Sequence, residues 1–249
     1  MNGDSSREVF SIKNRLVVVI PTYNEATSLP PLLDSLISRG CSVLVADDSS
    51  PDGTADVVRK YQKEYGAKVR LFLRAGRGGM GSAYRDAYIH LLSTDAPEFV
   101  AQMDADSSHP VALLSDMVYA AQQGYDLVLC SRLVRGGEYA GLSPVRRMIT
   151  RGASLLCRAV IGSFVKDYTS GFRLWRASAL RSIPLKRIRS KSFAFQIEMV
   201  WWAKRLGLRV FELPFRFDKR LAGKSKLDTA TITEALKLLA RISLSDCFL

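Results

Sequence analysis

Two carboxylates stand one residue apart in the segment FVAQMDADSSHP, residues 99–110. Asp104 and Asp106 follow an apolar run at the point where a buried strand would end, and each raises the cost of ionising the other. A divalent cation resolves this conflict, because hard cations prefer oxygen ligands. The alternative is a turn rich in Asp and Ser that caps the following helix, a role that these residue types also favour. From this segment alone, both interpretations stay open.

Alternating strands and helices must position these acids. In the first half of the chain, the apolar runs that predict strands are 16–20, 42–46, 69–73, 98–103 and 126–131. The helical patterns between them cover 27–39, 52–66 and 79–92, and Pro110 opens a further helix. Such alternation implies an α/β fold, with a mostly parallel sheet and helices on both of its faces.

Three polar clusters fall at the carboxyl ends of these strands. PTYNE (21–25) follows the first strand, DDSSPDG (47–53) the second and DADSSHP (104–110) the fourth. In parallel sheets ligands bind beyond the carboxyl ends of the strands, so the fold would gather the clusters on one rim. Unrelated turns would not share a chemistry, yet all three clusters carry acids. The metal interpretation is therefore favoured over the capping turn.

After residue 131 the alternation loosens. The expected elements are a helix over 142–164, a helix over 193–207, a strand over 209–217 that Pro214 interrupts, and an amphipathic helix over 229–244. A basic, glycine-containing loop, KRLAGKSKLD, precedes the last helix. No internal repeat or linker is evident, so we expect a single domain over residues 1–249.

The charge is divided unevenly along the chain. Residues 1–131 hold 12 Lys and Arg against 16 Asp and Glu, a net charge of −4, whereas residues 132–249 hold 24 against 8, a net charge of +16. A basic half suits nucleic acid, a phosphorylated ligand or an acidic membrane surface. The arginines of 142–164 are not interleaved with an aromatic stacking platform. That segment fits a helix lying on an anionic membrane, or one packed on the core with a charged outer face.

Several other classes of site are disfavoured. The four cysteines show no C-x-x-C pairing, which argues against a zinc site or disulfide scaffold and for a reducing compartment. GRGGMG (76–81) resembles a dinucleotide fingerprint but follows the third strand, so only a glycine loop near a phosphate stays open. An EF-hand loop would need Gly and Glu where the chain has His109 and Ser115. His109 is expected to have a role in the turn. No signal peptide and no transmembrane helix are expected.

Nine motifs occur in an order that resembles a known family. They are VVVIPTYNE, DDSSPDGT, GMGSAYRDAY, MDADSSHP, CSR, RRMITRGAS, DYTSGFRLWR, FAFQIEM and GKSKL. Over residues 15–227 the chain is similar to the dolichol-phosphate and polyprenyl-phosphate mannosyltransferases, which are inverting family 2 glycosyltransferases of GT-A fold. The DxD element is common to many sugar transferases, whereas the run from RGAS to GKSKL is far more specific to this subgroup.

The resemblance implies that mannose passes from GDP-mannose to a dolichyl or polyprenyl monophosphate with inversion, with Mg²⁺ or Mn²⁺ as the divalent metal. Residues 1–131 would bind nucleotide and metal, and residues 132–249 would bind the acceptor and face the membrane. No nucleic-acid partner is implied. Two alternatives stay open: a glucosyltransferase that uses UDP-glucose on the same lipid and, from another class, a basic nucleic-acid-binding protein.

The resemblance also implies roles for single residues, carried over motif by motif. On the donor side, Pro21, Tyr23 and Glu25 of PTYNE would hold the nucleoside. Ala46 and Asp48, around ADD, would contact the base or the ribose.

The motifs MDADSSHP and FAFQIEM supply the centre of the implied site. Asp104, Ala105 and Asp106 would lie along the diphosphate and the metal, with both aspartates catalytic. Ser108 stands where the family often has Gln as a further metal ligand, and Ala194 would line the donor site.

The basic motifs supply the phosphate contacts. Arg132 of CSR, which would also be catalytic and contact the donor, would receive the acceptor phosphate together with Arg146 and Thr150 of RRMIT. Arg220 and Lys226, on either side of LAGKS, would clamp the donor phosphates.

Many members of the family carry transmembrane helices after this domain, whereas this chain ends at SLSDCFL. It therefore resembles the short class, which lies on the membrane or is held there by a small membrane-anchoring subunit. We expect a peripheral protein on the cytoplasmic face, of the endoplasmic reticulum in a eukaryote or of the plasma membrane in a prokaryote. The Q-x-x-R-W signature of processive synthases is absent from the sequence.

Overall fold

Seven strands form one sheet in the order β3-β2-β1-β4-β6-β5-β7. The computed structural model describes residues 15–141, 143–217 and 229–246. The strands are β1 (Leu16–Thr22), β2 (Ser42–Asp47), β3 (Val69–Leu73), β4 (Phe99–Gln102), β5 (Leu127–Ser131), β6 (Arg173–Arg176) and β7 (Val210–Pro214). Neighbouring strands are parallel except where β6 pairs with β4 and β5. The expected mostly parallel sheet is confirmed, and its last strand ends at Pro214.

The pattern of the sequence does not predict β6. It has only four residues, of which three are buried, so it shows no alternation of apolar and polar side chains. Because β6 runs against its neighbours, its first residue lies at the rim where the parallel strands end. Gln102 of β4 pairs with Arg173 of β6. This register brings the residues just before β6 alongside those that follow β4.

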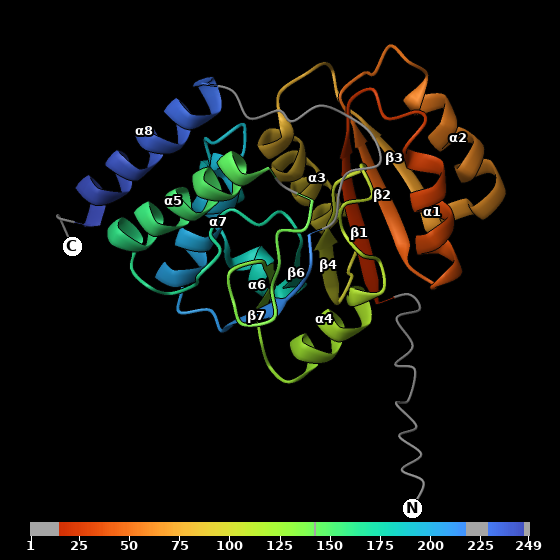
Figure 1. The fold of residues 1–249 in the computed structure, drawn as a ribbon. Coiled ribbons are helices and arrows are strands. Elements are labelled where there is room, and N and C mark those ends of the chain that lie inside the picture. Colours follow the sequence, from red (N-terminus) through yellow and green to blue (C-terminus); the bar gives the residue numbers. More distant parts are fainter. Residues whose placement is uncertain (1–14, 142, 218–228, 247–249) are drawn as a thin grey trace, which may run out of the picture.

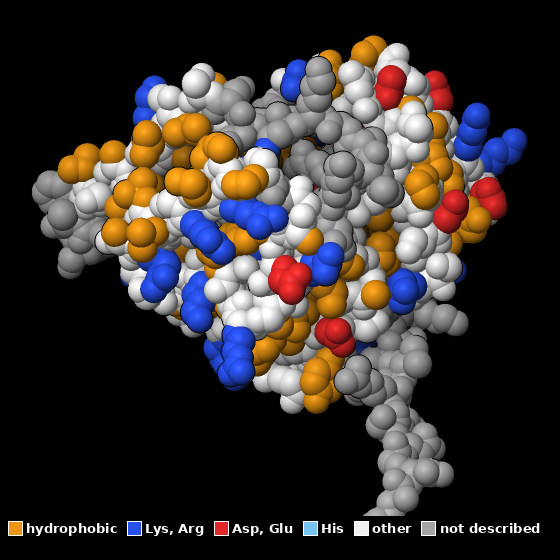
Figure 2. Space-filling view, viewed as in Figure 1, with side chains coloured by type: hydrophobic (Ala, Val, Ile, Leu, Met, Phe, Trp, Pro, Cys, Tyr) orange, Lys and Arg blue, Asp and Glu red, His pale blue; other side chains and the backbone are white. Residues whose placement is uncertain are grey.

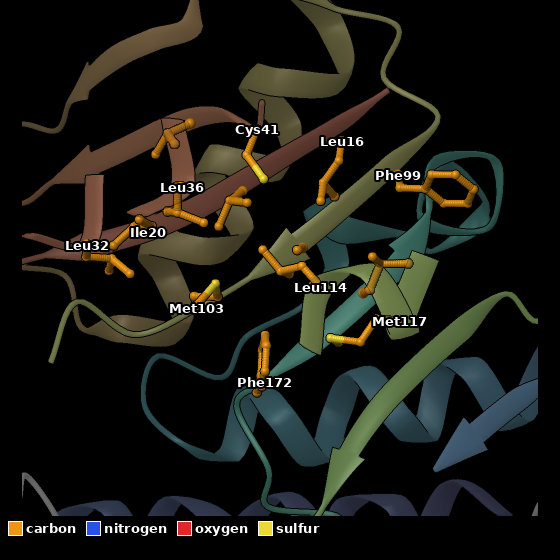
Figure 3. Close-up of a cluster of buried hydrophobic side chains, with 14 of the residues drawn as sticks. Leu16, Ile20, Leu32, Leu36, Cys41, Phe99, Met103, Leu114, Met117 and Phe172 are labelled. Carbon is orange, nitrogen blue, oxygen red and sulfur yellow. The ribbon is translucent and has the colours of Figure 1, made fainter. Parts of the chain in front are cut away.

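Helices cover both faces of the sheet (Figure 1). They are α1 (Leu29–Ser38), α2 (Thr54–Tyr65), α3 (Met80–Thr94), α4 (Leu113–Gln122), α5 (Pro144–Ile161), α6 (Ala177–Ser182), α7 (Ala194–Arg205) and α8 (Thr229–Asp246), with 3₁₀ turns at Gly66–Lys68 and Leu185–Arg187. One apolar cluster joins α1, α2 and α4 to the sheet, and a second joins α3, α6 and α7 to it. Figure 3 shows part of the first cluster, with Leu36 of α1 and Met117 of α4 among its members.

A third apolar cluster joins α5, α7 and α8. In Figure 1, α5 and α8 lie side by side at the end of the molecule opposite α1 and α2. The apolar stripe of α8 that faces this cluster consists of Leu238, Leu239 and Ile242, which are buried. Outside that stripe, Ile232, Leu236 and Leu244 are exposed. The expected C-terminal amphipathic helices are therefore present.

The ends of α5 follow from its sequence. The Ser143 side chain accepts a hydrogen bond from the backbone N–H of Arg146 at 3.4 Å, and Pro144 occupies the first turn, where a missing N–H costs nothing. The helix ends at Gly162, whose φ of 105° is accessible to glycine. No helix in the described ranges is long and apolar enough to cross a bilayer.

Candidate active site

The three polar clusters meet at the rim of the sheet. Strands β2 and β4 are the two neighbours of β1, and both run parallel to it. In register, Thr22 pairs with Asp47 and Val19 pairs with Gln102. The chain therefore leaves all three strands on the same side, as the carboxyl-end rule predicted.

The acidic cluster forms a tight turn that does not cap α4. Asp106 accepts a hydrogen bond from the backbone N–H of Ser108 at 3.1 Å, across Ser107, which has a φ of 59°. The backbone N–H of Asp104 donates to Nδ1 of His109 at 3.1 Å, so His109 has the role in the turn that we expected. The N-cap of α4 is Ala112, and no side chain bonds to that helix end. The capping interpretation therefore does not explain the two aspartates.

The chemistry of this turn fits a divalent cation. The Asp104 side chain is one-fifth exposed, whereas Asp106 and Ser108 are buried. The Ser108 hydroxyl has no hydrogen-bond partner, although it is buried. Nowhere in the described part of the chain do three His, Cys, Asp or Glu side chains gather as a metal site. Two carboxylates that leave the other coordination positions to substrate phosphates are a common arrangement for Mg²⁺. Ala105, between the aspartates, is buried in the first apolar cluster.

The adjacent acids Asp47 and Asp48 have different environments. Asp47 is fully buried and accepts hydrogen bonds from Thr22 at 2.8 Å and from Ser50, which ties β2 to β1. Asp48 forms an ion pair with Arg74 and accepts a hydrogen bond from the backbone N–H of Gly78 at 3.0 Å. Asp47 therefore stabilises the rim, and Asp48 is held in place at its edge.

The other expected donor-side residues surround this edge. The Arg77 guanidinium lies 4.6 Å from the ring centroid of Tyr23. The Glu25 carboxylate accepts a hydrogen bond from Ser28 at 2.6 Å. Pro21 is half-buried near the end of β1, and Ala46 is fully buried within β2.

The glycines of 76–81 allow close packing. A Cβ on Gly79, which has a φ of 91°, would stand 2.5 Å from the carbonyl oxygen of Lys191. A Cβ on Gly81 would stand 2.5 Å from Cβ of Phe195. These positions need glycine because the start of α3 lies directly against residues 191–195.

Arg132 follows β5 and is held by a buried carboxylate. Its Nε and Nη2 donate to the two oxygens of Asp167, each at 2.8 Å, and its backbone N–H donates to Asp167 at 3.1 Å. Burial alone would lower the pKa of Arg132, but the Asp167 charge outweighs it and the pKa is raised. Burial would likewise raise the pKa of Asp167, yet Arg132 holds it below the ordinary value. Both groups therefore stay charged.

A cavity of about 340 Å³ connects the acidic rim with α5 and α8. Asp104 and Arg132 border it, as do Arg146 and Thr150, which stand one helical turn apart on α5. Ala194, at the start of α7, also borders it. Its apolar wall includes Ile149, Leu156, Ile197, Ile232, Leu236 and Leu239.

The structure thus brings Asp104 to one cavity with Arg132, Arg146 and Thr150, the expected acceptor residues, whereas Asp106 does not border that cavity. Arg220 and Lys226 lie outside the described residues. Reasoning from the sequence missed Asp167 and Gln196. Both lie in quoted motifs, DYTSGFRLWR and FAFQIEM, but neither has a local spacing that would single it out.

Comparison with known proteins agrees with this geometry. The profile of glycosyl transferase family 2 matches residues 17–188. Undecaprenyl-phosphate mannosyltransferase from Micrococcus luteus is 36% identical over 93% of this chain and 95% of its own. Polyprenol monophosphomannose synthase from Mycolicibacterium smegmatis is 34% identical over 89% of this chain and 84% of its own.

Among solved structures, mannosyl-3-phosphoglycerate synthase from Rubrobacter xylanophilus superimposes with a TM-score of 0.68 at 20% identity, covering 94% of this chain and 75% of that one. This likeness concerns the fold alone, and it confirms the expected GT-A architecture. The profile covers more than half of the chain, and both relatives align over most of it. The chain therefore belongs to glycosyl transferase family 2.

Proposed function

We propose that this protein transfers mannose from GDP-mannose to a dolichyl or other polyprenyl monophosphate, with inversion at the anomeric carbon. The observation that carries the proposal is the single cavity that Asp104, Arg132, Arg146 and the apolar sides of α5 and α8 share. A polyprenyl phosphate has the same two-part chemistry, an anionic head and a hydrocarbon tail. The names of the two bacterial relatives support the same class of acceptor and the same sugar.

On the donor side, Pro21, Tyr23 and Glu25 would hold the nucleoside, and Ala46 and Asp48 would contact the base or ribose. This assignment is supported by their common position at the carboxyl ends of β1 and β2, with Pro21 and Ala46 in the last residues of the strands and the others just after them. The ion pair of Asp48 with Arg74 limits the orientations of its carboxylate.

Asp104 and Asp106 would hold the divalent metal, with Ser108 as a further oxygen ligand. When bound, such a cation would neutralise charge that develops on the departing diphosphate. Ala105 and Ala194 would line the same part of the site. Arg220 and Lys226, which lie outside the described residues, would contact the donor phosphates.

Transfer would proceed by an in-line attack. A phosphate oxygen of the acceptor forms the new bond to the anomeric carbon, and the bond from that carbon to GDP breaks on the opposite face, with GDP keeping the electron pair. A phosphate monoester has a second pKa of about 6, so it is mostly dianionic at neutral pH and needs no general base. Arg132, Arg146 and Thr150 would position it, since planar guanidinium groups suit phosphate oxygens.

The outer surfaces of α5 and α8 support a peripheral position on a membrane. Val145, Met148 and Leu155 of α5 are each at least 65% exposed, and Leu244 of α8 is 64% exposed. Figure 2 shows hydrophobic side chains gathered over this end of the molecule, with Lys and Arg side chains beside them. Apolar groups bordered by cations suit an anionic lipid surface. Use of a cytoplasmic donor would assign the protein to the cytoplasmic face.

The test combines purified protein, GDP-mannose and a polyprenyl phosphate in detergent, with Mg²⁺ or with EDTA. We expect mannosyl-phosphoryl lipid only with the metal, and none from Asp106→Asn. Asp116→Asn, the same change at an exposed position on α4, should retain activity. Product formation that survives both EDTA and Asp106→Asn would contradict the assigned site. If glucose were transferred from UDP-glucose faster than mannose from GDP-mannose, the protein would be a glucosyltransferase.

A further inference from the structure

Three buried polar atoms without hydrogen-bond partners lie in the segments around Asp104. They are the hydroxyl oxygens of Ser108 and Ser170 and the amide nitrogen Nε2 of Gln196. Ser108 and Ser170 are each 1% exposed, and Gln196 is fully buried. A buried polar group without a partner is costly, and native structures retain few of them. Ser108 is accounted for by the metal site, whereas nothing in the proposed mechanism uses Ser170 or Gln196.

The side chain of Gln196 is oriented by a chain of hydrogen bonds. The Tyr88 hydroxyl donates to the side-chain oxygen of Gln102 at 2.8 Å. The amide nitrogen of Gln102 in turn donates to the side-chain oxygen of Gln196 at 2.9 Å. All three side chains are fully buried. The Gln196 oxygen is therefore occupied, and its Nε2 points away from Gln102 with its hydrogen-bonding capacity unused.

Gly171 leaves an open position beside this nitrogen. A Cβ built on Gly171 would stand 3.8 Å from Nε2 of Gln196, 3.8 Å from Oδ2 of Asp104 and 3.8 Å from Cε1 of His109. These are ordinary contact distances, and the backbone of Gly171 is in a conformation open to any residue. Neither strain nor crowding therefore requires glycine here. Gly171 and Ser170 both border the cavity. Gln196 does not border it, and its Nε2 lies directly beside the position that a side chain of Gly171 would take.

Arg173 holds the two sides of this position together. The guanidinium is fully buried and donates to the carbonyl oxygens of Ser170 at 2.8 Å, Gln196 at 2.8 Å and Tyr168 at 3.1 Å. It thereby links the loop before β6 to the first turn of α7. The geometry is that of a rigid site, because the partners of Arg173 are backbone atoms.

We propose that Gln196 and Ser170, across the side-chain-free Gly171, bind hydroxyl groups of the sugar that is transferred. The inference rests on the proposed function and names the sugar subsite of the same cavity. An amide N–H and a hydroxyl are neutral, and the Asp104 carboxylate beside them disfavours a second anion, so a polyol fits better than a phosphate. The position adjoins Asp104, which would face the diphosphate, and the hexose of a nucleotide sugar lies next to its diphosphate.

The test measures the affinities for GDP and for GDP-mannose separately, by calorimetry with Mg²⁺ present. Gly171→Ala fills the open position with a methyl group, and we expect it to weaken GDP-mannose binding at least about tenfold with GDP binding within about twofold of wild type. Ser170→Ala removes a hydroxyl that has no partner in the protein. It should leave the fold intact and weaken GDP-mannose binding about three- to tenfold.

Gly152→Ala is the matched control. Gly152 also borders the cavity, on α5, and a Cβ there meets nothing within 4 Å. It should leave the ratio of the two affinities unchanged. The subsite is wrong if Ser170→Ala and Gly171→Ala change both affinities by the same factor, or neither. A wild-type protein that binds neither ligand would instead overturn the proposed function, so the two failures are distinguishable.

Discussion

Arg132 and Asp167 form a two-pronged ion pair in which both oxygens of the carboxylate accept hydrogen bonds from the guanidinium at 2.8 Å. The Asp167 side chain is fully buried and the Arg132 side chain is 9% exposed. Nη2 of Arg132 also donates to the Thr169 hydroxyl at 2.8 Å. The pair fixes the plane of the guanidinium that would receive the acceptor phosphate. Asp167 is therefore a positioning residue for Arg132.

Replacing Asp167 should affect both stability and acceptor binding. Asp167→Asn leaves the Arg132 charge buried without its counter-ion, so the free energy of unfolding should fall by about 3–5 kcal/mol in urea denaturation. The KM for polyprenyl phosphate should rise more than the Kd for GDP, because the Asp167 carboxylate accepts its hydrogen bonds from Arg132 and Thr169. Asp56→Asn, which breaks an exposed ion pair with Arg59, should cost about 1 kcal/mol or less. If Asp167→Asn and Asp56→Asn lowered the free energy of unfolding and raised the KM for polyprenyl phosphate by equal amounts, Asp167 would not be the residue that positions Arg132.

The rim was predictable from the sequence because it depends on one simple property of the strands. Parallel strands end on the same side, so acids that follow β1, β2 and β4 must share a rim whatever the details of packing. The helices were predictable for a similar reason, since α5 carries both its apolar spacing and its N-cap Ser143 in its own sequence.

The partners within the site were not predictable in this way. Asp167 lies 35 residues from Arg132 along the chain, and Gln196 lies 94 residues from Gln102. These contacts arise because β6 lies between β4 and β5 and runs antiparallel to both. Its direction depends on pairing with these distant strands, and the periodicity of its own residues does not indicate it. A four-residue strand has too short a pattern to reveal its direction. The partners of Arg132 and Gln102 therefore follow from the pairing of distant strands, which the local sequence pattern does not predict.

The outer surface of α5 should bind anionic lipid through its exposed apolar side chains. Leu155 is 65% exposed, and inserting it into the lipid boundary removes its apolar area from water. Leu155→Ser should lower the partition coefficient onto phosphatidylglycerol-containing vesicles by about tenfold in a co-sedimentation assay. Leu73→Ser, the same change at a 49% exposed position on the far edge strand β3, should have no such effect. Equal losses from both would argue against α5 as the lipid-facing surface.

Glu234 connects α8 to the segment that precedes α7. Its carboxylate accepts hydrogen bonds from the backbone N–H of Lys191 at 2.6 Å and of Ser192 at 3.1 Å, and from the Ser192 hydroxyl. The carbonyl of Lys191 in turn accepts from the backbone N–H of Gly81, at the start of α3, at 2.8 Å. Glu234 therefore anchors the segment that packs on the glycine loop.

Glu234→Ala should release this segment. Trypsin cleaves after lysine only when the backbone can open, so cleavage after Lys191 should become faster by about tenfold or more. Mass spectrometry of the fragments over time measures this rate. Glu234→Gln keeps one acceptor oxygen and should give an intermediate rate. Lys237→Ala, at an exposed position one turn along α8, should cleave like the wild type. If Glu234→Ala is cleaved no faster than this control, the anchor is not what protects Lys191.

Three buried thiols, of Cys41, Cys130 and Cys157, should make the fold sensitive to alkali, since burial raises the pKa of each. Burial raises the pKa of Cys41 and of Cys157 to about 12 in each case, from an ordinary value of 9.0. The unfolded chain then releases these protons above pH 9 while the folded protein retains them. Stability is therefore complete below pH 9 and falls as the pH rises toward 12, by about 1.4 kcal/mol per pH unit for each thiol.

Urea denaturation at pH 8 and at pH 10.5 measures this loss. In Cys41→Ala the loss between the two pH values should be smaller than in the wild type by about 2 kcal/mol, because one titrating group is gone. Val43→Ala removes a buried side chain that does not titrate, so it should lower the free energy of unfolding by the same amount at both pH values. If Cys41→Ala and the wild type lose stability in parallel, the Cys41 thiol does not contribute to the alkaline transition, and the groups responsible must lie elsewhere.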